Sequence, residues 1–337
     1  MKIFLFILPF IFVTQTYAQI SDFDHLDFKK SDSIALVYKN EGLYNLPQLA
    51  FQLTSTLDTD AERFRAIYRW VCNNISNNYS LYLKHKRKTE RFKNDSLKLK
   101  NWNDDFRKKL FNKLLKDQST ICTGYAYLVK ELAQLAHIDC EIVQGYGRVS
   151  TTDLEKLDQP NHSWNAVKLN NKWYLCDPTW ASGIPDPKTN RFTFQYNDGF
   201  FLTNPKLFAV NHFPVEEKWW LLDKTIPSFK SFLASPVIYG NAYTYLNRHV
   251  LPKKMHHTII PFDKITFEYQ VKPSVRIKDI TLQIDNGFNT WKTKPHATSL
   301  NKTSLIIEYQ FKTLGFYDVH FFINDDLIST YTVKVKS

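Results

Sequence analysis

Cys122 has the type and position of a reactive residue. It stands where the small and polar lead-in of QSTICTGYAYLVKELAQLAH, residues 118–137, gives way to an amphipathic helical pattern. A cysteine becomes a nucleophile only where its thiolate is stabilised, and a helix N-terminus does this with unpaired N–H groups and the helix dipole. The same amides can hold the oxyanion of an acyl transfer. Cys122 is therefore a candidate nucleophile, with a small buried core residue and half of a disulfide as the alternatives.

A base for this thiol lies further along the chain, in HSWNAVKLNNKWYLCDPTW, which starts at His162. The segment alternates as two strands around the turn residues Asn170 and Asn171. With a two-residue turn, Trp164 pairs with Asp177, and His162 lies diagonal to Asp177 on the same face, about 7–8 Å away between backbones. Asp177 can then orient the imidazole and favour its protonated form. The spacing predicts a nucleophile–base–orienter triad of cysteine, histidine and aspartate.

Each of these three residues also has a purely structural interpretation. Cys122 can be an inert residue at a helix start, and His162 can be a satisfied residue of a strand. Asp177 can cap a turn, with Pro178 ending the strand ladder. The order of the three along the chain, and the face that two of them share, favour chemistry over coincidence.

The other cysteines are expected to be structural. Cys176 precedes Asp177 by one position and so points to the opposite face of its strand, which indicates packing. If Cys122 is kept for chemistry, at least one of Cys72, Cys140 and Cys176 stays unpaired, although an exported chain can form one bridge. The sequence has no Cys-x-x-Cys or His-x-x-x-His ligand pair, so no metal site is predicted, and no cofactor is expected.

Helices and strands that can position these residues are visible in the sequence. TDAERFRAIYRWVCNNI predicts a helix with Thr59 or Asp60 as N-cap, and Ser119 and Thr120 are expected to cap the Cys122 helix. Three strands are predicted in CEIVQGYGRV, HSWNAVKL and KWYLCDPTW. The aromatic segment FFLTNPKLFAVNHFPVEEKWWLL is expected to cover this core.

A different pattern fills the last part of the chain. Five strand-like runs alternate with turn signals and predict an antiparallel sandwich with a corner at Gly315 and Tyr317. The runs are DKITFEYQV, IKDITLQID, TSLIIEYQF, GFYDVHFFI and LISTYTVKV. No cysteine lies in this part, so an immunoglobulin-like sandwich here lacks a bridge between its sheets. The sequence thus predicts a catalytic domain over 19–235 and a β-sandwich domain over 236–337.

Residues 1–18 are expected to be a signal peptide. Lys2 precedes a short apolar run, and a small-x-small sequence ends at Ala18, which predicts cleavage near that residue and a periplasmic or secreted protein. The apolar run is too short to span a membrane, and no transmembrane segment is predicted.

The formal net charge of +11 is spread widely along the chain but is densest between Lys84 and Lys116. Leucines and phenylalanines recur in this stretch at helical spacing, which favours a solvated helical insertion over a surface that attracts acidic polymers. Nucleic-acid binding is not predicted, because the chain has no motif for it.

The two central motifs resemble a known family. ICTGYAYLVKELAQLAHIDCEIVQGY and HSWNAVKLNNKWYLCDPTW are similar to the core of the transglutaminase-like superfamily, most of all to an exported bacterial branch related to kyphoscoliosis-type peptidases. The resemblance extends from about Ala61 to Leu222. It implies Cys122 as nucleophile, His162 as base and Asp177 as orienting carboxylate. The expected fold is an α+β papain-like (transglutaminase-like) core followed by an all-β immunoglobulin-like sandwich.

These observations together predict an exported, cysteine-dependent enzyme that transfers acyl groups from amide bonds through a thioester on Cys122. Water as the acceptor makes it a peptidase or amidase, which we favour. A lysine amine as the acceptor makes it a protein cross-linking transglutaminase. The alternative from another class is a non-catalytic binding or scaffolding protein on the same fold. The expected partner is a protein or peptide substrate, including one associated with the cell envelope.

Overall fold

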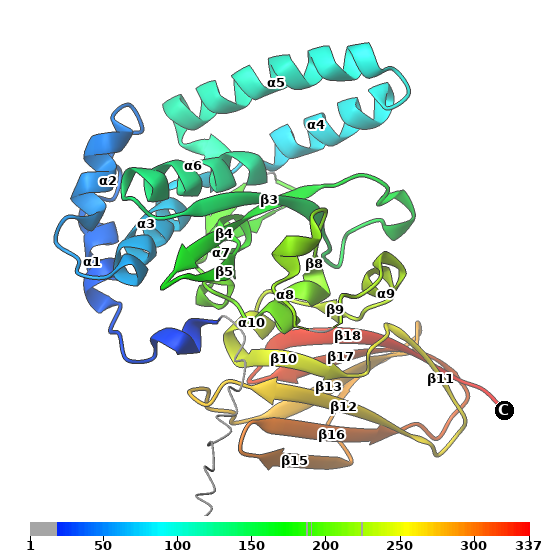
Figure 1. The fold of residues 1–337 in the computed structure, drawn as a ribbon. Helices are drawn as coiled ribbons and strands as arrows, with labels where there is room; N and C mark the ends of the chain where they lie inside the picture. Colours follow the sequence, from blue (N-terminus) through cyan, green and yellow to red (C-terminus); the bar gives the residue numbers. More distant parts are fainter. Residues whose placement is uncertain (1–18, 187, 190, 224) are drawn as a thin grey trace, which may run out of the picture.

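The computed structural model describes residues 19–337 apart from 187, 190 and 224. The predicted signal peptide, 1–18, lies outside the described residues. Two parts follow each other along the chain, a mixed helix-and-sheet part and a part made mostly of strands (Figure 1). Within the described part of the chain, no helix has the length and apolar character that crossing a membrane requires.

Most helices belong to the first part. They are α1 (Lys29–Val37), α2 (Leu46–Thr54), α3 (Asp60–Asn74), α4 (Tyr79–Phe92), α5 (Ser96–Asp117), α6 (Cys122–Leu135), α7 (Pro178–Ser182), α8 (Pro205–Asn211) and α9 (Phe229–Leu233), whereas α10 (Ala242–Tyr245) lies between two strands of the second part. The strands of the first part are β1 (Ser76–Asn77), β2 (Ser119–Thr120), β3 (Cys140–Gly147), β4 (His162–Leu169), β5 (Lys172–Cys176), β6 (Gly183–Pro185), β7 (Phe192–Phe194) and β8 (His212–Pro214).

The strands of the second part are short to medium in length. They are β9 (Val237–Ile238), β10 (Leu246–Leu251), β11 (His256–Ile259), β12 (Lys264–Val271), β13 (Ile280–Asp285), β14 (Thr290–Thr293), β15 (Ala297–Asn301), β16 (Ser304–Gln310), β17 (Gly315–Ile323) and β18 (Asp326–Val335).

A four-stranded antiparallel sheet in the order β5-β4-β3-β8 lies at the centre of the first part. Helix α6 packs on this sheet, and the Asn165 side chain of β4 donates a hydrogen bond to the Ala126 carbonyl of α6 at 2.9 Å. Helix α3 starts at the predicted cap, where Thr59 and Glu62 form a capping box. The α+β core expected from the sequence is confirmed.

The hairpin of β4 and β5 has the predicted register, with a two-residue turn after Leu169 and Leu169 paired with Lys172. The prediction for the end of this hairpin is wrong. Strand β5 ends at Cys176, and Asp177 starts a short helix instead of pairing with Trp164. The proline that follows has no N–H to give to a strand ladder, and its fixed φ suits the first position of a helix.

The Cys122 helix begins differently from its predicted cap. Ser119 and Thr120 form strand β2, which pairs in parallel with β1, and the N-cap is Ile121, which makes no side-chain cap hydrogen bond. Pairing with β1 keeps the two hydroxyl residues extended, so neither occupies the cap position. The first N–H groups of α6 therefore receive no capping side chain at the point where Cys122 stands.

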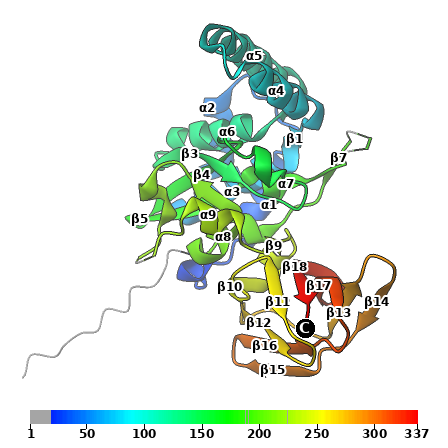
Figure 2. The same cartoon turned by 90° about the vertical axis from the view of Figure 1, so that its right-hand side faces the viewer.

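The basic insertion is helical, as predicted. Helices α4 and α5 form a hairpin that projects from the core beyond α6, on the side away from the strand-rich part (Figures 1 and 2). Phe106 and Leu110 of α5 pack with Ile121 in a small apolar cluster of their own. Because Ile121 precedes Cys122, the hairpin is anchored next to the candidate nucleophile.

Two sheets make up the second part. One has the order β10-β12-β16-β15, and the other has the order β11-β18-β17-β13-β14 with β9 added to β18. The rings of Tyr269 and Phe321, one from each sheet, stack with centroids 4.8 Å apart, so the sheets pack face to face. All five predicted strands are present. At the predicted corner, Tyr317 donates a hydrogen bond to the Thr313 carbonyl at 3.0 Å.

Arg148 joins the two parts. It follows β3, is buried, and donates hydrogen bonds to the carbonyls of Ser235 and Pro236 at 2.8 and 2.6 Å. Asn211 of α8 donates to the carbonyls of Arg148 and of Ile238 in β9, at 2.7 and 3.0 Å. The segment just before β8 is thereby fixed to the second part. The predicted domain boundary falls between Ser235 and Pro236 and stays a prediction.

Candidate active site

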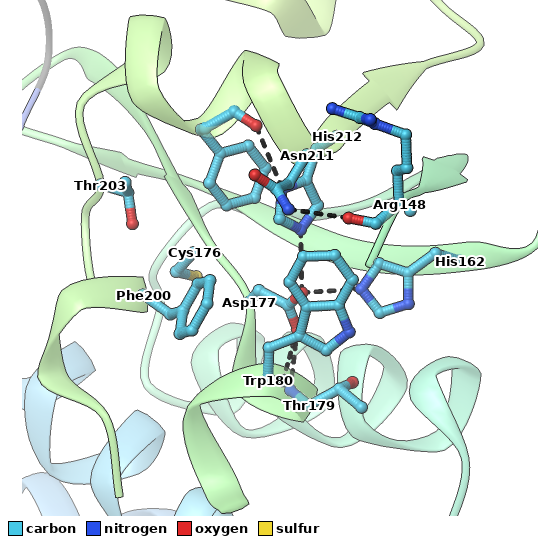
Figure 3. A network of polar contacts seen from close by, with 12 residues as sticks. Arg148, His162, Cys176, Asp177, Thr179, Trp180, Phe200, Thr203, Asn211 and His212 are labelled. Atoms are coloured by element: carbon cyan, nitrogen blue, oxygen red, sulfur yellow. Dashed lines mark hydrogen bonds and ion pairs between the residues drawn. The ribbon is translucent and has the colours of Figure 1, made fainter. Parts of the chain in front are cut away.

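Asp177 lies at the centre of a network of hydrogen bonds (Figure 3). It is fully buried and caps the N-terminus of α7, with Oδ1 accepting from the backbone N–H groups of Thr179 and Trp180 at 2.9 and 3.0 Å. The capping role that the sequence offered as an alternative is therefore present. It occupies only one oxygen of the carboxylate, so the other is available to the site.

The second oxygen, Oδ2 of Asp177, contacts two imidazole rings. Nε2 of His162 lies 2.7 Å from it, and Nε2 of His212 lies 3.0 Å from it (Figure 3). Both histidines are buried. The structure thus brings His162 and Asp177 together as predicted, but it does so through the N-cap of α7 and not across a strand pair.

The backbone of Asp177 is held on both sides. Its N–H donates to the Phe200 carbonyl at 3.1 Å, and its carbonyl accepts from the hydroxyl of Tyr68, on α3, at 3.0 Å. Tyr68 is fully buried, and its hydroxyl also lies 3.0 Å from the Phe200 carbonyl. A carboxylate fixed at its backbone and at Oδ1 has little freedom left, which is what an orienting residue needs.

The charges of His162 and Asp177 stabilise each other. Burial disfavours the charged imidazole, yet the pKa of His162 is raised to about 10, because the Asp177 charge and its hydrogen bond outweigh burial, helped by a hydrogen bond with Cys122. Burial likewise opposes the Asp177 carboxylate, but His162 and His212 hold its pKa well below its usual range. At neutral pH His162 and Asp177 are therefore an imidazolium–carboxylate pair.

Cys122 opens α6 and is 8% exposed, so it lies at the edge of solvent. Burial raises the pKa of its thiol, but the hydrogen bond and charge of His162, together with the Ser163 backbone, outweigh burial and lower it. Because Nε2 of His162 faces Asp177, Nδ1 is the ring nitrogen left for the sulfur. His162 and Asp177 thus meet as predicted, Cys122 lies within electrostatic reach of His162, and the catalytic roles of the three residues stay a prediction.

The other three cysteines have the opposite environment. Cys72, Cys140 and Cys176 are buried, and burial raises the pKa of each thiol. All four cysteines lie in the described range, and all four are free. Cys176 packs with its sulfur 3.9 Å from the Asn165 carbonyl, in line with the structural role predicted for it. Cys122 is thus the cysteine whose surroundings favour a thiolate.

The ring of His162 is confined by its neighbours. Trp180 stacks on it with centroids 4.8 Å apart and an interplanar angle of 19°, and Trp180 also contacts the His212 ring at 4.4 Å. On the neighbouring strand, Gly147 leaves the space that the histidine needs, since a Cβ there would lie 2.8 Å from the Cβ of His162. This confinement keeps the ring directed toward Asp177.

His212 is the site residue that sequence reasoning missed. It starts β8, inside the segment expected only to cover the core, and β8 instead adds an edge strand beside β3. Nδ1 of His212 lies 3.2 Å from the Phe208 carbonyl, one turn earlier. Burial lowers the pKa of His212 to about 4, with Asp177 opposing only in part. The neutral His212 ring carries a single N–H group. It donates this hydrogen from Nε2 to Asp177, because a carboxylate is a stronger acceptor than the Phe208 carbonyl. The sequence signal that could have identified His212 is a histidine inside the apolar run LFAVNHFP.

His162, Asp177 and His212 together also offer the atoms of a metal site, with one donor atom from each within 4.8 Å of the others. The spacing of ligands along the chain could not reveal this group, because its members come from three separate segments. The two short N···O contacts, 2.7 and 3.0 Å, fit hydrogen bonds that satisfy these donors among themselves.

Replacing His212 with alanine is expected to slow the alkylation of Cys122 by iodoacetamide at about pH 6 by 10- to 100-fold, the usual cost of removing an orienting partner. Without this donor, Oδ2 of Asp177 is freer to turn away from His162. His212→Gln should restore most of the rate, because a glutamine N–H can reach the position of Nε2. Thermal unfolding of both variants serves as the folding control, and a wild-type rate in His212→Ala would show that Asp177 needs no second donor.

The chain is similar to known proteins over a region that includes this site. The sequence model described as transglutaminase-like superfamily matches residues 47–178, which include Cys122, His162 and Asp177. Kyphoscoliosis peptidase of Homo sapiens is 30% identical over 296 residues, which are 86% of this chain and 40% of the human protein. The Mus musculus protein of the same name is 29% identical over the same shares of both chains.

A more distant relative shows the same kind of partial match. Hillarin of Drosophila melanogaster is 25% identical over 235 residues, which are 66% of this chain and 26% of Hillarin. The chain spans about 40% of the length of the two mammalian relatives.

Proposed function

Because residues 47–178 form a transglutaminase-like domain, we propose that this protein is a cysteine-dependent acyl-transfer enzyme that acts on the amide bonds of proteins or peptides. In this proposal Cys122 is the nucleophile, His162 the base and Asp177 the carboxylate that orients the base. The observation that carries the proposal is the position of His162, which is hydrogen-bonded to Asp177 at 2.7 Å and near enough to Cys122 that the two residues shift each other's pKa.

The first step of the proposed reaction forms a thioester. The Cys122 thiolate attacks the amide carbonyl carbon, and the resulting oxyanion develops near the uncapped N–H groups of α6. As the C–N bond breaks, the His162 imidazolium gives its proton to the departing amine. The acyl group stays on Cys122.

The second step releases the acyl group. Neutral His162 takes a proton from water, and the water oxygen attacks the thioester carbon, so that the carboxylic acid leaves and the thiolate–imidazolium pair returns. Water is the acceptor in this proposal because it needs no binding pocket of its own. The enzyme is then a peptidase or amidase.

We also propose that the enzyme is exported and that its strand-rich part is an immunoglobulin-like sandwich used to dock a protein or envelope polymer. Export is supported by the charged, apolar and small-residue pattern of residues 1–18. The sandwich is supported by its two face-to-face sheets and by the hydrogen bond of Tyr317 to Thr313 at a strand corner.

The test is the rate of Cys122 alkylation by iodoacetamide from about pH 4 to pH 9, in wild type and in His162→Ala. A lowered pKa keeps the wild-type thiolate present as the pH falls, so the wild-type rate should stay substantial below pH 6. In the variant burial and the Asp177 charge raise the thiol pKa, and only the Ser163 backbone opposes them, so we expect thiolate to form only at alkaline pH. The rate at about pH 6 should then fall by roughly 100-fold or more, since a thiol of ordinary pKa is under 1% ionised there.

Mass spectrometry of the peptide that contains Cys122 confirms which cysteine reacts. If the alkylation rate rises only around pH 8.5 in both proteins, Cys122 is not an activated thiol. A non-catalytic binding protein would then be the better interpretation.

A further inference from the structure

The helical hairpin of α4 and α5, residues 79–117, carries most of the net charge of the protein. It contains thirteen lysines and arginines and five acidic residues, a net charge of +8 out of a formal +11 for the whole chain. Residues 236–337 have thirteen basic and eight acidic residues, a net charge of +5, and the rest of the chain has a net charge of −2, so positive charge is densest on this one projecting element (Figures 1 and 2). A localised field of this kind attracts oppositely charged partners and raises their association rate.

Most of this charge is not neutralised within the hairpin. Four lysines form ion pairs with four of the acidic residues: Lys93 with Glu90, Lys98 with Asp95, Lys100 with Asp104, and Lys113 with Asp117. Within residues 79–117, all of which the structure describes, the other nine basic side chains have no carboxylate within 4.0 Å. Eight of these nine are exposed. They are Lys84, Lys86, Arg87, Arg91, Arg107, Lys108, Lys109 and Lys116.

The base of the hairpin adjoins the candidate active site. Its two ends are joined by β1 and β2, where the Asn78 N–H donates to the Thr120 carbonyl at 2.7 Å, two residues before Cys122. The apolar cluster with Ile121 holds α5 to the same place. Leu81 and Tyr82 of α4 pack against the same cluster, so α4 also lies beside the residue that precedes Cys122.

The hairpin also approaches the other side of the site. The loop between β3 and β4 ends at His162, and charges in that loop act on the hairpin. Glu90 and, more weakly, Asp158 of the loop raise the pKa of Lys93. Asp153 and, more weakly, Glu90 raise the pKa of Lys156 in the loop. The end of α4 therefore lies within electrostatic reach of the loop that leads to His162.

We infer that the α4–α5 hairpin is a docking arm for an acidic segment of the polypeptide substrate, which it holds while the scissile bond lies at Cys122. This inference rests on the proposed function for its link to catalysis. Helix α5 has 22 residues and is about 33 Å long, which matches roughly ten residues of extended chain. Ten of the thirteen basic residues are lysines, whose mobile point charges suit carboxylates at varied positions.

A membrane is a less suitable partner for this surface. A helix that lies on a bilayer needs an apolar face to insert beside its basic residues. Here the apolar side chains Trp102, Phe106 and Leu110 pack inward. The exposed ones, Leu97 and Leu115, lie far apart along α5 and form no continuous face.

The experiment measures binding without turnover. Fluorescence anisotropy follows a fluorescein-labelled ten-residue glutamate peptide on Cys122→Ala protein, at low salt and at about 150 mM salt. We expect salt-sensitive binding that weakens at least about tenfold when Lys86, Arg87, Lys108 and Lys109 are changed to glutamate. The matched control places the same four changes at exposed lysines of the strand-rich part, Lys253, Lys254, Lys312 and Lys336, and should stay within about twofold.

A milder variant with glutamine at the four hairpin positions, checked by circular dichroism, guards against loss of the fold. Equal affinity in the hairpin and control variants would overturn the inference. So would tighter binding to vesicles rich in phosphatidylserine, or to a single-stranded DNA oligomer, than to the peptide.

A second measurement tests the link to the active site. In wild-type protein, the glutamate peptide at saturation should slow iodoacetamide alkylation of Cys122, whereas a ten-residue serine peptide should not. Peptide binding without protection would overturn the placement of the bound segment at Cys122. Neither measurement depends on amide cleavage, so failure of the proposed function and failure of the docking arm give different results.

Discussion

The Cys122→Ser variant is expected to lose acyl-enzyme formation entirely. With p-nitrophenyl acetate as the acyl donor, wild-type protein should release a burst of up to about one p-nitrophenolate per molecule as the thioester forms. A serine hydroxyl at this position has a pKa far above that of a thiol, and His162, already protonated at neutral pH, cannot remove its proton. The rate constant of the burst should fall by at least about 10⁴-fold, within the range seen when a triad nucleophile is removed.

The control for this prediction is another cysteine of the same protein. Cys140→Ala removes a buried thiol whose pKa is raised by burial, and it should leave the burst intact. Cys122→Ser is nearly isosteric and should unfold within a few degrees of wild type, because Cys122 lies at a helix end and not in the apolar core. A burst of normal size in Cys122→Ser would assign the acylation to another group and would end the proposed mechanism.

The sequence predicts the identity of the three triad candidates better than their geometry. The β4–β5 register follows from a two-residue Asn-Asn turn, a local feature, and it is correct. The path from His162 to Asp177 is not correct, because Pro178 starts a helix where strand pairing was expected to continue. The predicted strand pairing and the observed helix start at α7 both bring the Asp177 carboxylate to the His162 imidazole. This explains how a wrong local structure gave the right pair of residues.

His212 shows what local patterns cannot reveal. It reaches Asp177 because β8 pairs with the edge of the sheet at β3, a contact between segments far apart in sequence. No periodicity within residues 200–222 encodes that pairing. The same holds for the charged hairpin: its helical period is visible in the sequence, but its anchoring beside Cys122 depends on β1, β2 and the packing of Ile121.

The Asp177→Asn variant is expected to slow turnover of an amide or ester substrate by about 10³- to 10⁴-fold with little loss of stability, as in other triads. Asparagine keeps an oxygen for the N–H groups of Thr179 and Trp180, so the cap of α7 survives. It removes the negative charge that raises the pKa of His162. Burial then dominates and lowers that pKa, so the imidazole is neutral at pH 7.

The sign of the pH effect follows from this loss. In wild type His162 keeps its proton up to about pH 10, and the imidazolium stabilises the Cys122 thiolate below the ordinary thiol pKa. In Asp177→Asn the imidazolium is absent at neutral pH, so the pKa of Cys122 rises. The alkylation rate should be low at pH 6 and should increase only toward pH 9 and above. Asp177→Glu, which keeps the charge but displaces the carboxylate, should retain part of the alkylation at pH 6.

Stability decides between an orienting and a structural role for Asp177. If Asp177→Asn unfolds at much lower urea concentration than wild type, the carboxylate is needed mainly to hold α7 and the buried histidines. If instead the midpoint is nearly unchanged and the alkylation profile moves to alkaline pH, the charge of Asp177 acts through His162 on Cys122. The second outcome is the one expected, because the backbone contacts to Phe200 and Tyr68 hold this residue whether or not its side chain is charged.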